Sequence, residues 1–486
     1  MHFMKEKSVD ELIISYLFPP SKDIAGMILA KRFMVEKKPF DVIQANIKSE
    51  NDFEFKKLVD EYINEQILID SNCNPNFPKC IFPFIDKSME ILDKRDTYKK
   101  INTIVWKIAN NFLALEYKLK HPEVYWAAEF SDPLLFGIYN QRLDNDKNKN
   151  INDMEYLSKI NEAISQLNKT ENTDFPIIED NTNVHFLVEY LTYLFADEII
   201  FTNKNQMDMM LNQFPVDVKS FVEDKSVIKP HPTLPEEYYH VINSDDDFDS
   251  SKINIGYFGN IYSKRHFEIV YNAFEILNHK HKDKLEFHFY VYEKDFVLQL
   301  TEGLEISNNL HIKDAVDFLE FLNLTTKLDV LIVNDLITSD CFDANPYLPS
   351  KISDYAGSGS DIWAICEKGS TLSRCDVKYR SYIHDLKSNV DTLAEILKDH
   401  SYDDDFSVSD SYEYYMQKRL TRLNVLIDTE HKKAEKAKND VKKFKKANSK
   451  LKKDNSNIKQ ENEEILSSNS WKLTKSFRKV GSIIKK

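Results

Sequence analysis

Glycine and cysteine are both scarce in this chain, which has 9 Gly and 5 Cys among 486 residues. The cysteines form no metal-ligand spacing, which excludes a zinc-ribbon or zinc-finger protein. Their odd number and their mostly apolar surroundings predict reduced thiols of a cytosolic protein. They are Cys73, Cys80, Cys341, Cys366 and Cys375.

Long apolar runs are missing too. No run approaches the ~20 apolar residues that a membrane-spanning helix needs, and the apolar run 12–18 is too short and too poorly flanked for a signal peptide. With 42% hydrophobic and 12% aromatic residues, the chain can still bury real cores. Its length predicts two or three domains, since single cores stop growing near ~250–300 residues.

Charge is unevenly distributed. The formal net charge is −14, but residues 431–486 carry 18 Lys and Arg against 6 Asp and Glu, a net +12 that leaves −26 for residues 1–430. An acidic body argues against nucleic-acid binding by that body, and a basic tail favours contact with an anionic surface.

Short apolar runs alternate with helical patterns through most of the chain, as is typical of parallel α/β domains. A Pro-rich segment at 229–235 separates two such series. This predicts a Rossmann-like domain over residues 1–230 and a second over 231–385, with a ligand cleft between them. Residues 140–180 are polar and rich in Asn and Asp, which predicts an insertion or a mobile loop. Helices that close the second domain are expected over 386–430.

The individual elements are predicted from apolar runs and helical periodicity. Strands are expected at 12–18, 40–47, 101–106, 124–130 and 198–202 in the first series, and at 253–258, 285–292, 310–312, 329–333 and 362–366 in the second. Helices of the first series are expected at 23–36, 109–119, 184–195 and 205–213.

The C-terminal part shows a heptad pattern. Apolar residues recur every seven positions at Phe444, Leu451, Ile458 and Ile465, and the positions three residues earlier are Val441, Asn448, Asn455 and Asn462. This favours a parallel coiled coil over residues 431–468 that joins two or three copies of the chain, with a solvated lone helix as the alternative. Residues 469–486 combine basic and apolar side chains, which favours contact with an anionic membrane surface over a disordered basic tail.

One stretch suggests chemistry most directly. Residues 349–359 read Pro-Ser-Lys-Ile-Ser-Asp-Tyr-Ala-Gly-Ser-Gly, which is typical of a short helix with Ser350 as its cap and a Gly-rich stop. Lys351 and Asp354 then lie on the first turn, where N–H groups favour an anion. A cation for a diphosphate and a carboxylate for a ribose diol suit a nucleotide-sugar site. A capped surface helix is the alternative.

A second stretch follows the first strand of the second series. Residues 255–266 read as a strand, a Gly-rich turn with Gly256 and Gly259, and a helix start with Lys264 and Arg265. Cations at a helix start are disfavoured unless an anion is near, so a phosphate partner is expected there.

These two segments, in this order, resemble the donor domain of GT-B-fold glycosyltransferases, in particular the retaining group-1, family-4 type that builds bacterial surface polysaccharides. The resemblance implies that Arg265 and Lys351 contact the donor diphosphate with Lys264 in support, and that Asp354 takes the place of the usual ribose-binding Glu. The matched donor positions are Gly259, Lys264, Arg265, Ser350, Lys351, Asp354 and Ser370.

The first series adds further matches to the same family. Residues 18–26, followed by Lys31 and Arg32, look like its acceptor-side loop, and residues 126–133 resemble its Trp-x-Ala-(Asp/Glu)-Phe-x-Asp-Pro segment. The resemblance implies that Asp132 orients or deprotonates the acceptor hydroxyl. An ordinary turn or helix cap is the alternative for Ser-Asp-Pro.

The chain also departs from the family pattern. The family often has two glutamates eight positions apart, where this chain has Pro346 and Asp354, and Asp343 is the nearest substitute for the first acid. His231 could touch the donor or could be structural. The acidic stretches 245–247 and 403–405 are expected to be solvated loops, so neither a metal nor another cofactor is expected.

Together these features predict an α/β protein with two Rossmann-like (GT-B) domains and a C-terminal coiled-coil extension. The expected activity is metal-independent, retaining transfer of a sugar from a nucleotide-diphosphate donor to a bacterial surface polymer or glycolipid, at the cytoplasmic face of the membrane. Two alternatives stay open: a polyol-phosphate transferase of the teichoic-acid type, and a non-catalytic scaffold subunit of the same fold.

Overall fold

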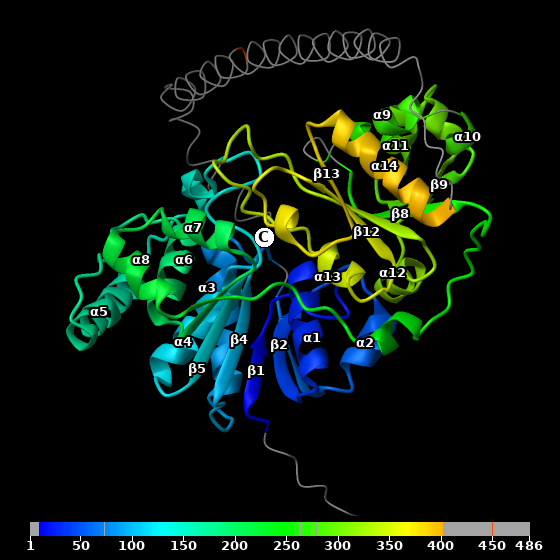
Figure 1. Ribbon diagram of the computed structural model, residues 1–486. Coiled ribbons are helices and arrows are strands. Elements are labelled where there is room, and N and C mark those ends of the chain that lie inside the picture. The colour runs from blue at the N-terminus through cyan, green and yellow to red at the C-terminus, as the bar shows by residue number, and fades with distance from the viewer. Residues whose placement is uncertain are drawn as a thin grey trace, which may run out of the picture. The chain divides into compact units, whose positions relative to one another are not determined.

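The structure is a computed structural model that describes residues 9–71, 73–261, 265, 267–277, 279–401 and 450. The described residues up to Ser401 belong to one compact unit, which contains two parallel sheets (Figure 1). The expected coiled coil at 431–468 and basic tail at 469–486 lie outside the described residues, Lys450 apart.

The first sheet has seven strands in the order β3-β2-β1-β4-β5-β6-β7, all parallel. Its strands are β1 Glu11–Ile14, β2 Phe40–Asn46, β3 Ile63–Asp70, β4 Lys100–Val105, β5 Tyr125–Phe130, β6 Glu198–Phe201 and β7 Ser226–Ile228. Its helices are α1 Ile24–Glu36, α2 Phe53–Val59, α3 Pro78–Leu92, α4 Ala109–Lys120, α5 Met154–Glu171, α6 Val184–Phe195, α7 Lys204–Leu211 and α8 Val216–Glu223.

The second sheet has six strands in the order β10-β9-β8-β11-β12-β13, again all parallel. Its strands are β8 Ile253–Phe258, β9 Leu285–Val291, β10 Leu310–Asp314, β11 Val330–Asn334, β12 Asp361–Cys366 and β13 Tyr379–Tyr382. Its helices are α9 Glu268–Ile276, α10 His279–Lys282, α11 Lys294–Thr301, α12 Phe318–Thr325, α13 Lys351–Tyr355 and α14 Leu386–Ser401. The two parallel sheets confirm the predicted α/β class with two Rossmann-like domains in the GT-B layout.

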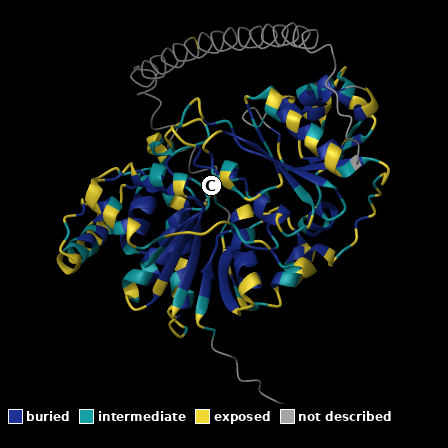
Figure 2. Cartoon of the chain, viewed as in Figure 1, coloured by how far each residue is buried: buried dark blue, intermediate teal, exposed yellow. Residues whose placement is uncertain are grey.

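The central strands are buried on both faces because helices cover each sheet on both sides (Figure 2). Three apolar cores result. One lies between the first sheet and α3 to α8, and another lies between the second sheet and α9, α11 and α14. The third core contains residues of both sheets, including Ile13 and Leu331, together with α1, α2, α12 and α13. The two Rossmann-like domains therefore share an apolar joint in this structure.

Local signals explain where α1 begins. The Asp23 side chain accepts a hydrogen bond from the Gly26 N–H at 3.1 Å and caps the helix. A Cβ at Gly26 would lie 2.2 Å from the Leu17 carbonyl oxygen, so only glycine lets the loop after β1 pack on the helix. This packing fixes the first turn of a helix that carries Lys31 and Arg32 into the joint.

Some local elements were not expected. Of the two interpretations of the segment 140–180, the mobile loop is wrong, because the segment contains the helix α5: Asp153 caps it, and Leu157, Ile160 and Ile164 form a narrow buried stripe within polar composition. The strands β3, β7 and β13 were not expected. β3 and β7 lie at the edges of the first sheet and β13 at one edge of the second, and their sequences are short or largely polar.

The prediction of reduced thiols is wrong for Cys73 and Cys80, which form a disulfide. Cys80 lies in the first turn of α3, and the preceding loop brings the two Cα atoms to 5.5 Å, within the normal range for a disulfide. Cys341, Cys366 and Cys375 are free. In the part of the chain that the structure describes, no helix has both the length and the hydropathy of a membrane span.

Candidate functional site

The candidate site lies where the strand order of the second sheet reverses. β8 and β11 are neighbours in that sheet, and their onward connections run to opposite edges. In open parallel sheets this switch point, outside the carboxyl ends of the strands, is where ligands bind. Gly259 follows β8 directly and Asp335 follows β11 directly, so both lie at this edge.

The two predicted donor segments meet at Gly259 and Lys351. Gly259 has a φ of +125°, and a Cβ there would lie 2.9 Å from Cε of Lys351. The Lys351 Nζ lies 4.5 Å from the centre of the Phe321 ring, a cation–π contact. The backbone conformation therefore favours glycine at 259, and a side chain there would push the end of Lys351 aside. Two segments about ninety residues apart in the sequence thus lie side by side at the candidate site.

Burial lowers the pKa of Lys351 to about 8. The Asp354 carboxylate opposes this shift, whereas the positive charges of Arg265 and Lys31 add to it. An ammonium group that is desolvated and close to other cations is costly to keep charged. Binding of a polyanion such as a diphosphate would restore its charge.

Arg265 connects the two sheets electrostatically. Burial raises the pKa of Asp132, which follows β5 of the first sheet, and of Asp335, which follows β11 of the second, and the positive charge of Arg265 opposes both rises. The same charge lowers the pKa of Lys351. The structure thus brings three predicted residues, Arg265, Lys351 and Asp132, into one electrostatic neighbourhood. Lys264, another cation predicted for this site, lies outside the described residues.

Asp132 is half-buried just beyond β5. Among the described residues, its carboxylate makes no hydrogen bond and no ion pair. Burial raises the pKa of Asp132 to about 7, and the opposing charge of Arg265 limits the rise. It caps no described helix, although residues 131 and 132 lie in a bend, as in the alternative of an ordinary turn. A carboxyl that titrates near neutral pH suits proton transfer.

Asp335 is a candidate residue that the sequence reasoning missed. It is 1% exposed, and its Oδ2 accepts a hydrogen bond from the Glu367 N–H at 2.9 Å. Oδ1 has no hydrogen-bond partner in the described structure, and the same holds for Oδ1 of the neighbouring Asn334. Burial raises the pKa of Asp335 to about 7, against the effect of the nearby Ser370 hydroxyl. The sequence feature that could have identified Asp335 was a polar Asn-Asp pair directly after a buried apolar strand.

Glu367 orders the start of the loop between β11 and α13. Its carboxylate accepts hydrogen bonds from the Thr338 N–H at 2.9 Å, the Thr338 hydroxyl at 2.6 Å and the Ser339 N–H at 2.7 Å. Burial alone would raise the pKa of Glu367, but these donors outweigh burial and the pKa is lowered. The carboxylate is therefore fully used in holding the loop, and it is a structural group.

Two residues predicted to bind the sugar donor, Ser370 and Ser350, make hydrogen bonds to residues close to them in the sequence. Ser370 is completely buried, and its hydroxyl oxygen accepts a hydrogen bond from the Ser373 N–H at 3.0 Å. The prediction that Ser350 caps the helix through its side chain is wrong. Ser350 stands at the N-cap position of α13, but with helical backbone angles and no side-chain capping bond, and its carbonyl accepts from the Ser353 N–H at 3.2 Å.

Asp354, the predicted ribose ligand, is paired with the first domain. Its Oδ1 lies 2.7 Å from Nζ of Lys31 on α1, and the side chains are 8% and 4% exposed. The next residue of α1, Arg32, makes a bidentate pair with Glu129 on β5, at 2.6 and 2.7 Å. Lys31 and Arg32 therefore lie within α1, in the helix predicted at 23–36, and both make buried contacts.

The Pro-rich hinge packs against the same residues. Arg32 donates to the carbonyl oxygens of Lys229 at 3.2 Å and Pro230 at 3.1 Å. The Nε2 atom of His231 is buried and has no hydrogen-bond partner among the described residues. Burial lowers the pKa of His231 to about 3, and the charges of Lys31 and Arg32 contribute to the shift. His231 is therefore neutral at physiological pH and lies beside the ion pairs of the joint.

Loops at the carboxyl ends of both sheets also touch. The Asn140 side chain donates to the Cys341 carbonyl at 2.7 Å, and the Asn203 side chain donates to the Pro346 carbonyl at 3.0 Å. Asn205 donates to the Asn345 carbonyl, also at 3.0 Å. The loop between β11 and α13, which ends at Lys351, is thus held from the first domain.

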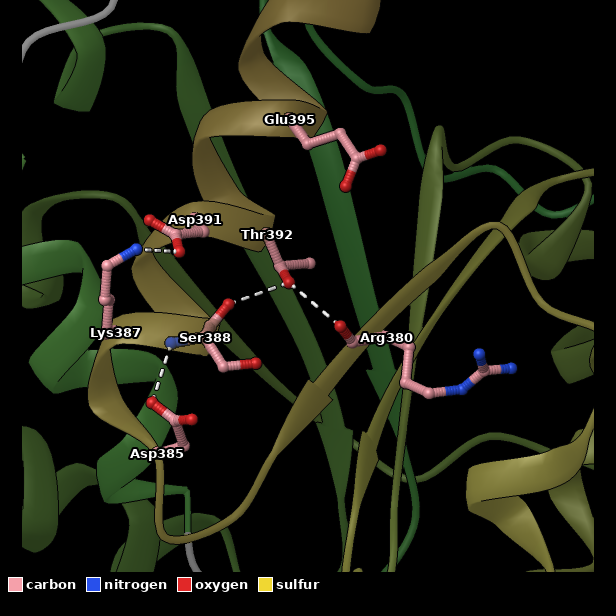
Figure 3. A pocket seen from close by; sticks show the side chains of 7 residues that line it. All are labelled: Arg380, Asp385, Lys387, Ser388, Asp391, Thr392 and Glu395. Carbon is pink, nitrogen blue, oxygen red and sulfur yellow. Dashed lines mark hydrogen bonds and ion pairs between the residues drawn. The ribbon is translucent and has the colours of Figure 1, made fainter.

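A surface depression of about 420 Å³ lies away from these residues, at the start of α14 (Figure 3). Its polar groups bond to one another: the Ser388 N–H donates to Asp385 at 3.0 Å, and the Thr392 hydroxyl donates to the Arg380 carbonyl at 3.2 Å. We do not assign it a ligand. No cluster of His, Cys, Asp or Glu able to hold a metal ion occurs within the described ranges.

Comparison with known proteins gives similarity of fold at low identity. No protein-family model matches the chain, and no curated protein sequence matches it. HepE from Anabaena, solved with UDP and glucose, is 10% identical, with a TM-score of 0.48 over 80% of this chain and 90% of that one. Sucrose-phosphate synthase from Thermosynechococcus elongatus is 11% identical, with a TM-score of 0.49 over 81% and 90%.

A glycosyltransferase from Rickettsia africae is similar to this chain to the same extent. It is 11% identical to this chain, with a TM-score of 0.49 over 81% of this chain and 89% of its own. At these values the likenesses concern the path of the backbone, and they do not by themselves identify an activity.

Proposed function

We propose that this protein is a glycosyltransferase that takes a sugar from a nucleotide-diphosphate donor. The observation that carries the proposal is the meeting of Gly259 and Lys351 at the switch point of the second sheet, with Arg265 in electrostatic contact with Lys351. Two cations beside a glycine turn of positive φ suit a diphosphate, which needs close backbone approach and two compensating charges.

The proposed chemistry follows from the charges. Departure of the diphosphate from the sugar leaves negative charge on its oxygens, and Lys351 and Arg265 would stabilise that charge more strongly than the charge of the intact donor. Asp132, on the first domain and facing Arg265, would orient the acceptor hydroxyl or accept its proton. These roles use only side chains of this chain, in keeping with a metal-independent enzyme.

The wider proposal concerns the acceptor and the place of action. A bacterial surface polymer or glycolipid at the cytoplasmic membrane face would suit a basic amphipathic tail at 469–486, and a coiled coil at 431–468 would join copies of the chain. Retention of anomeric configuration belongs to the same proposal, which here rests on the family resemblance of residues 349–359 and 255–266.

The test is a panel of nucleoside diphosphates in a thermal-shift experiment. A ligand at about 100 times its Kd stabilises the folded state by about 2.7 kcal/mol, so we expect UDP, GDP or ADP to raise the Tm by several degrees. Lys351→Ala should abolish the shift, while Lys387→Ala on the exposed face of α14 should leave it unchanged.

The panel also separates the competing functions. A response to CDP alone would favour transfer of a polyol phosphate. If no nucleoside diphosphate shifts the Tm of the folded full-length protein, donor binding is contradicted and a scaffold role is favoured.

A further inference from the structure

The short helix α13 carries both Lys351 and Asp354, and it is held by groups from outside the second sheet. The Tyr239 hydroxyl donates to the Asp354 carbonyl at 2.5 Å, and the Thr233 hydroxyl donates to the Ser353 carbonyl at 2.8 Å. Both donors belong to the segment that joins the two sheets. A Cβ at Gly357, two residues after the end of α13, would lie 2.3 Å from the Tyr239 hydroxyl oxygen, so this contact needs a glycine at that position.

The third anchor is the ion pair between Asp354 and Lys31. Its atoms are 2.7 Å apart, and α1, which supplies Lys31, packs on the first sheet. Both side chains are almost fully removed from solvent. A ribose diol that took over Oδ1 would displace Lys31 and leave an ammonium buried without a partner, and the low exposure of the carboxylate restricts access to Oδ2. The position expected to read ribose is therefore used to join the domains.

The anchored helix also positions Lys351. Residues at i and i+3 of a helix lie one above the other, so fixing Asp354 fixes the turn from which Lys351 projects. Lys351 in turn passes beside Gly259 and lies over the Phe321 ring. A shift of α13 would therefore move Lys351 relative to Gly259 and the Phe321 ring.

We propose that Lys31 is a positioning residue for the donor site: through its ion pair with Asp354 it holds α13 so that Lys351 meets the donor diphosphate. Asp354 then serves as the anchor and does not bind the ribose. The proposal rests on the proposed function for the identity of the ligand at Lys351. It makes donor affinity depend on a contact between the two domains.

A second ion pair between the same domains provides a matched control. Lys22, just before α1, lies 2.5 Å from Asp317, the residue before α12, and their side chains are 35% and 56% exposed. This pair crosses the same joint but does not include α13. Loss of Lys22 should therefore leave donor binding unchanged.

The test is a double-mutant cycle with Lys31→Met and Asp354→Asn in the full-length protein, both near in size to the native side chains. Calorimetry would measure the affinity for the nucleoside diphosphate that stabilises the wild type and for its 2′,3′-dideoxy form. We expect each single variant to lose at least 10-fold in affinity, the double variant to lose no more than the worse single variant, and Lys31→Arg to recover most of the loss. Lys22→Ala should bind as the wild type does.

The dideoxy ligand separates anchoring from ribose binding. If Asp354 is an anchor, the ratio of the two affinities is the same in the wild type and in Asp354→Asn. A ratio that collapses to one in Asp354→Asn, with Lys31→Met unaffected, would overturn the inference and restore Asp354 as the ribose ligand. Absence of binding to the wild type would contradict the proposed function itself, whereas binding that is indifferent to Lys31 would contradict only the role of Lys31. Circular dichroism of each variant shows whether it is folded.

Discussion

The carboxyl edges of the two sheets carry similar polar residues but satisfy them differently. At the first sheet, the Asn110 side chain accepts from the Tyr16 N–H at 2.6 Å and donates to the Ile104 carbonyl at 3.0 Å. Gln206 there donates to the Phe130 carbonyl at 2.9 Å and accepts from the Thr202 N–H at 2.8 Å. These side chains act as links between loops.

At the carboxyl edge of the second sheet, some buried polar groups lack hydrogen-bond partners in the described structure. Asn334 and Asp335, at the end of β11, are each buried with one oxygen unsatisfied in the described structure. Lys351 lies near Arg265 although both are cationic, and this proximity lowers the pKa of the lysine. Unsatisfied buried polar groups and close like charges each cost free energy. Asn111 at the first edge also leaves its Oδ1 without a partner in the described structure, so the two edges differ mainly in charge: the ionisable groups Asp335, Lys351 and Arg265 gather at the second edge, as the proposed diphosphate site requires.

Asp132 is the exception on the first edge, and its removal should have the largest effect. Asp132→Asn keeps the size of the side chain but cannot accept a proton, so we expect a loss of about 10²–10⁴-fold in kcat with donor affinity retained. Because the pKa of Asp132 is raised to about 7, wild-type activity should rise with pH through that value. Steady-state kinetics with sugar donors built on the nucleoside diphosphate that stabilises the protein would measure both the loss in kcat and the pH profile.

The control for this variant is Asp217→Asn, at an exposed position in the first turn of α8. It should leave kcat unchanged. Full activity of Asp132→Asn with an unaltered pH profile would show that this carboxylate belongs with the satisfied groups of the first edge.

Glu129, three residues before Asp132, is a paired carboxylate of the first sheet, and its removal should affect stability. Glu129→Gln leaves the Arg32 guanidinium buried without its charged partner, and breaking such a pair costs about 3–5 kcal/mol. We expect that loss in the free energy of unfolding measured by urea denaturation. A loss below about 1 kcal/mol would mean that the Arg32–Glu129 pair is not what stabilises this edge.

The role of Asp335 can be tested by measuring how the free energy of unfolding depends on pH. Its pKa is raised from 3.8 to about 7 in the folded protein, so the folded state binds the proton more tightly than the unfolded state does. Its unfavourable contribution is therefore absent below about pH 4 and grows as pH rises towards 7, by at most about 1.4 kcal/mol for each pKa unit. Asp335→Asn should gain stability over the wild type across this window.

Urea unfolding of both proteins at several pH values between 4 and 8 measures the difference. Parallel stability curves would show that Asp335 is compensated in the folded protein, and the contrast between the two edges would lose its main support.

The smallest effect is expected at Lys22. Its pair with Asp317 is largely exposed, and such pairs contribute about 0–1 kcal/mol. Lys22→Ala should therefore change the free energy of unfolding by less than 1 kcal/mol in the urea experiment. A larger change would mean that exposed contacts hold the joint as firmly as buried ones.

Much of the fold could be predicted from the sequence, because the central strands of a parallel sheet are continuous apolar runs. The strands β2, β5 and β8 were placed to within a residue. The edge strand β3 was not, since one of its faces is solvated and its sequence, Ile-Asn-Glu-Gln-Ile-Leu-Ile-Asp, is half polar. The helix α5 was missed because its apolar stripe is narrow.

The meeting of the segments of Gly259 and Lys351 was expected from the family resemblance. The fold explains it, because β8 and β11 are neighbouring parallel strands and the residues that follow them share an edge. The partner of Asp354 could not be foreseen, because Lys31 is 323 residues away and comes from the other sheet. The Cys73–Cys80 disulfide depended on a loop path that composition does not encode.

The most direct measurement is calorimetric titration of the wild type, Lys351→Ala and Arg265→Ala with the nucleoside diphosphate that stabilises the protein. The account predicts saturable binding to the wild type and at least a 10-fold weaker affinity in each variant, since a hydrogen bond to a charged group contributes about 1.5–3 kcal/mol. Equal affinity in all three proteins would contradict it.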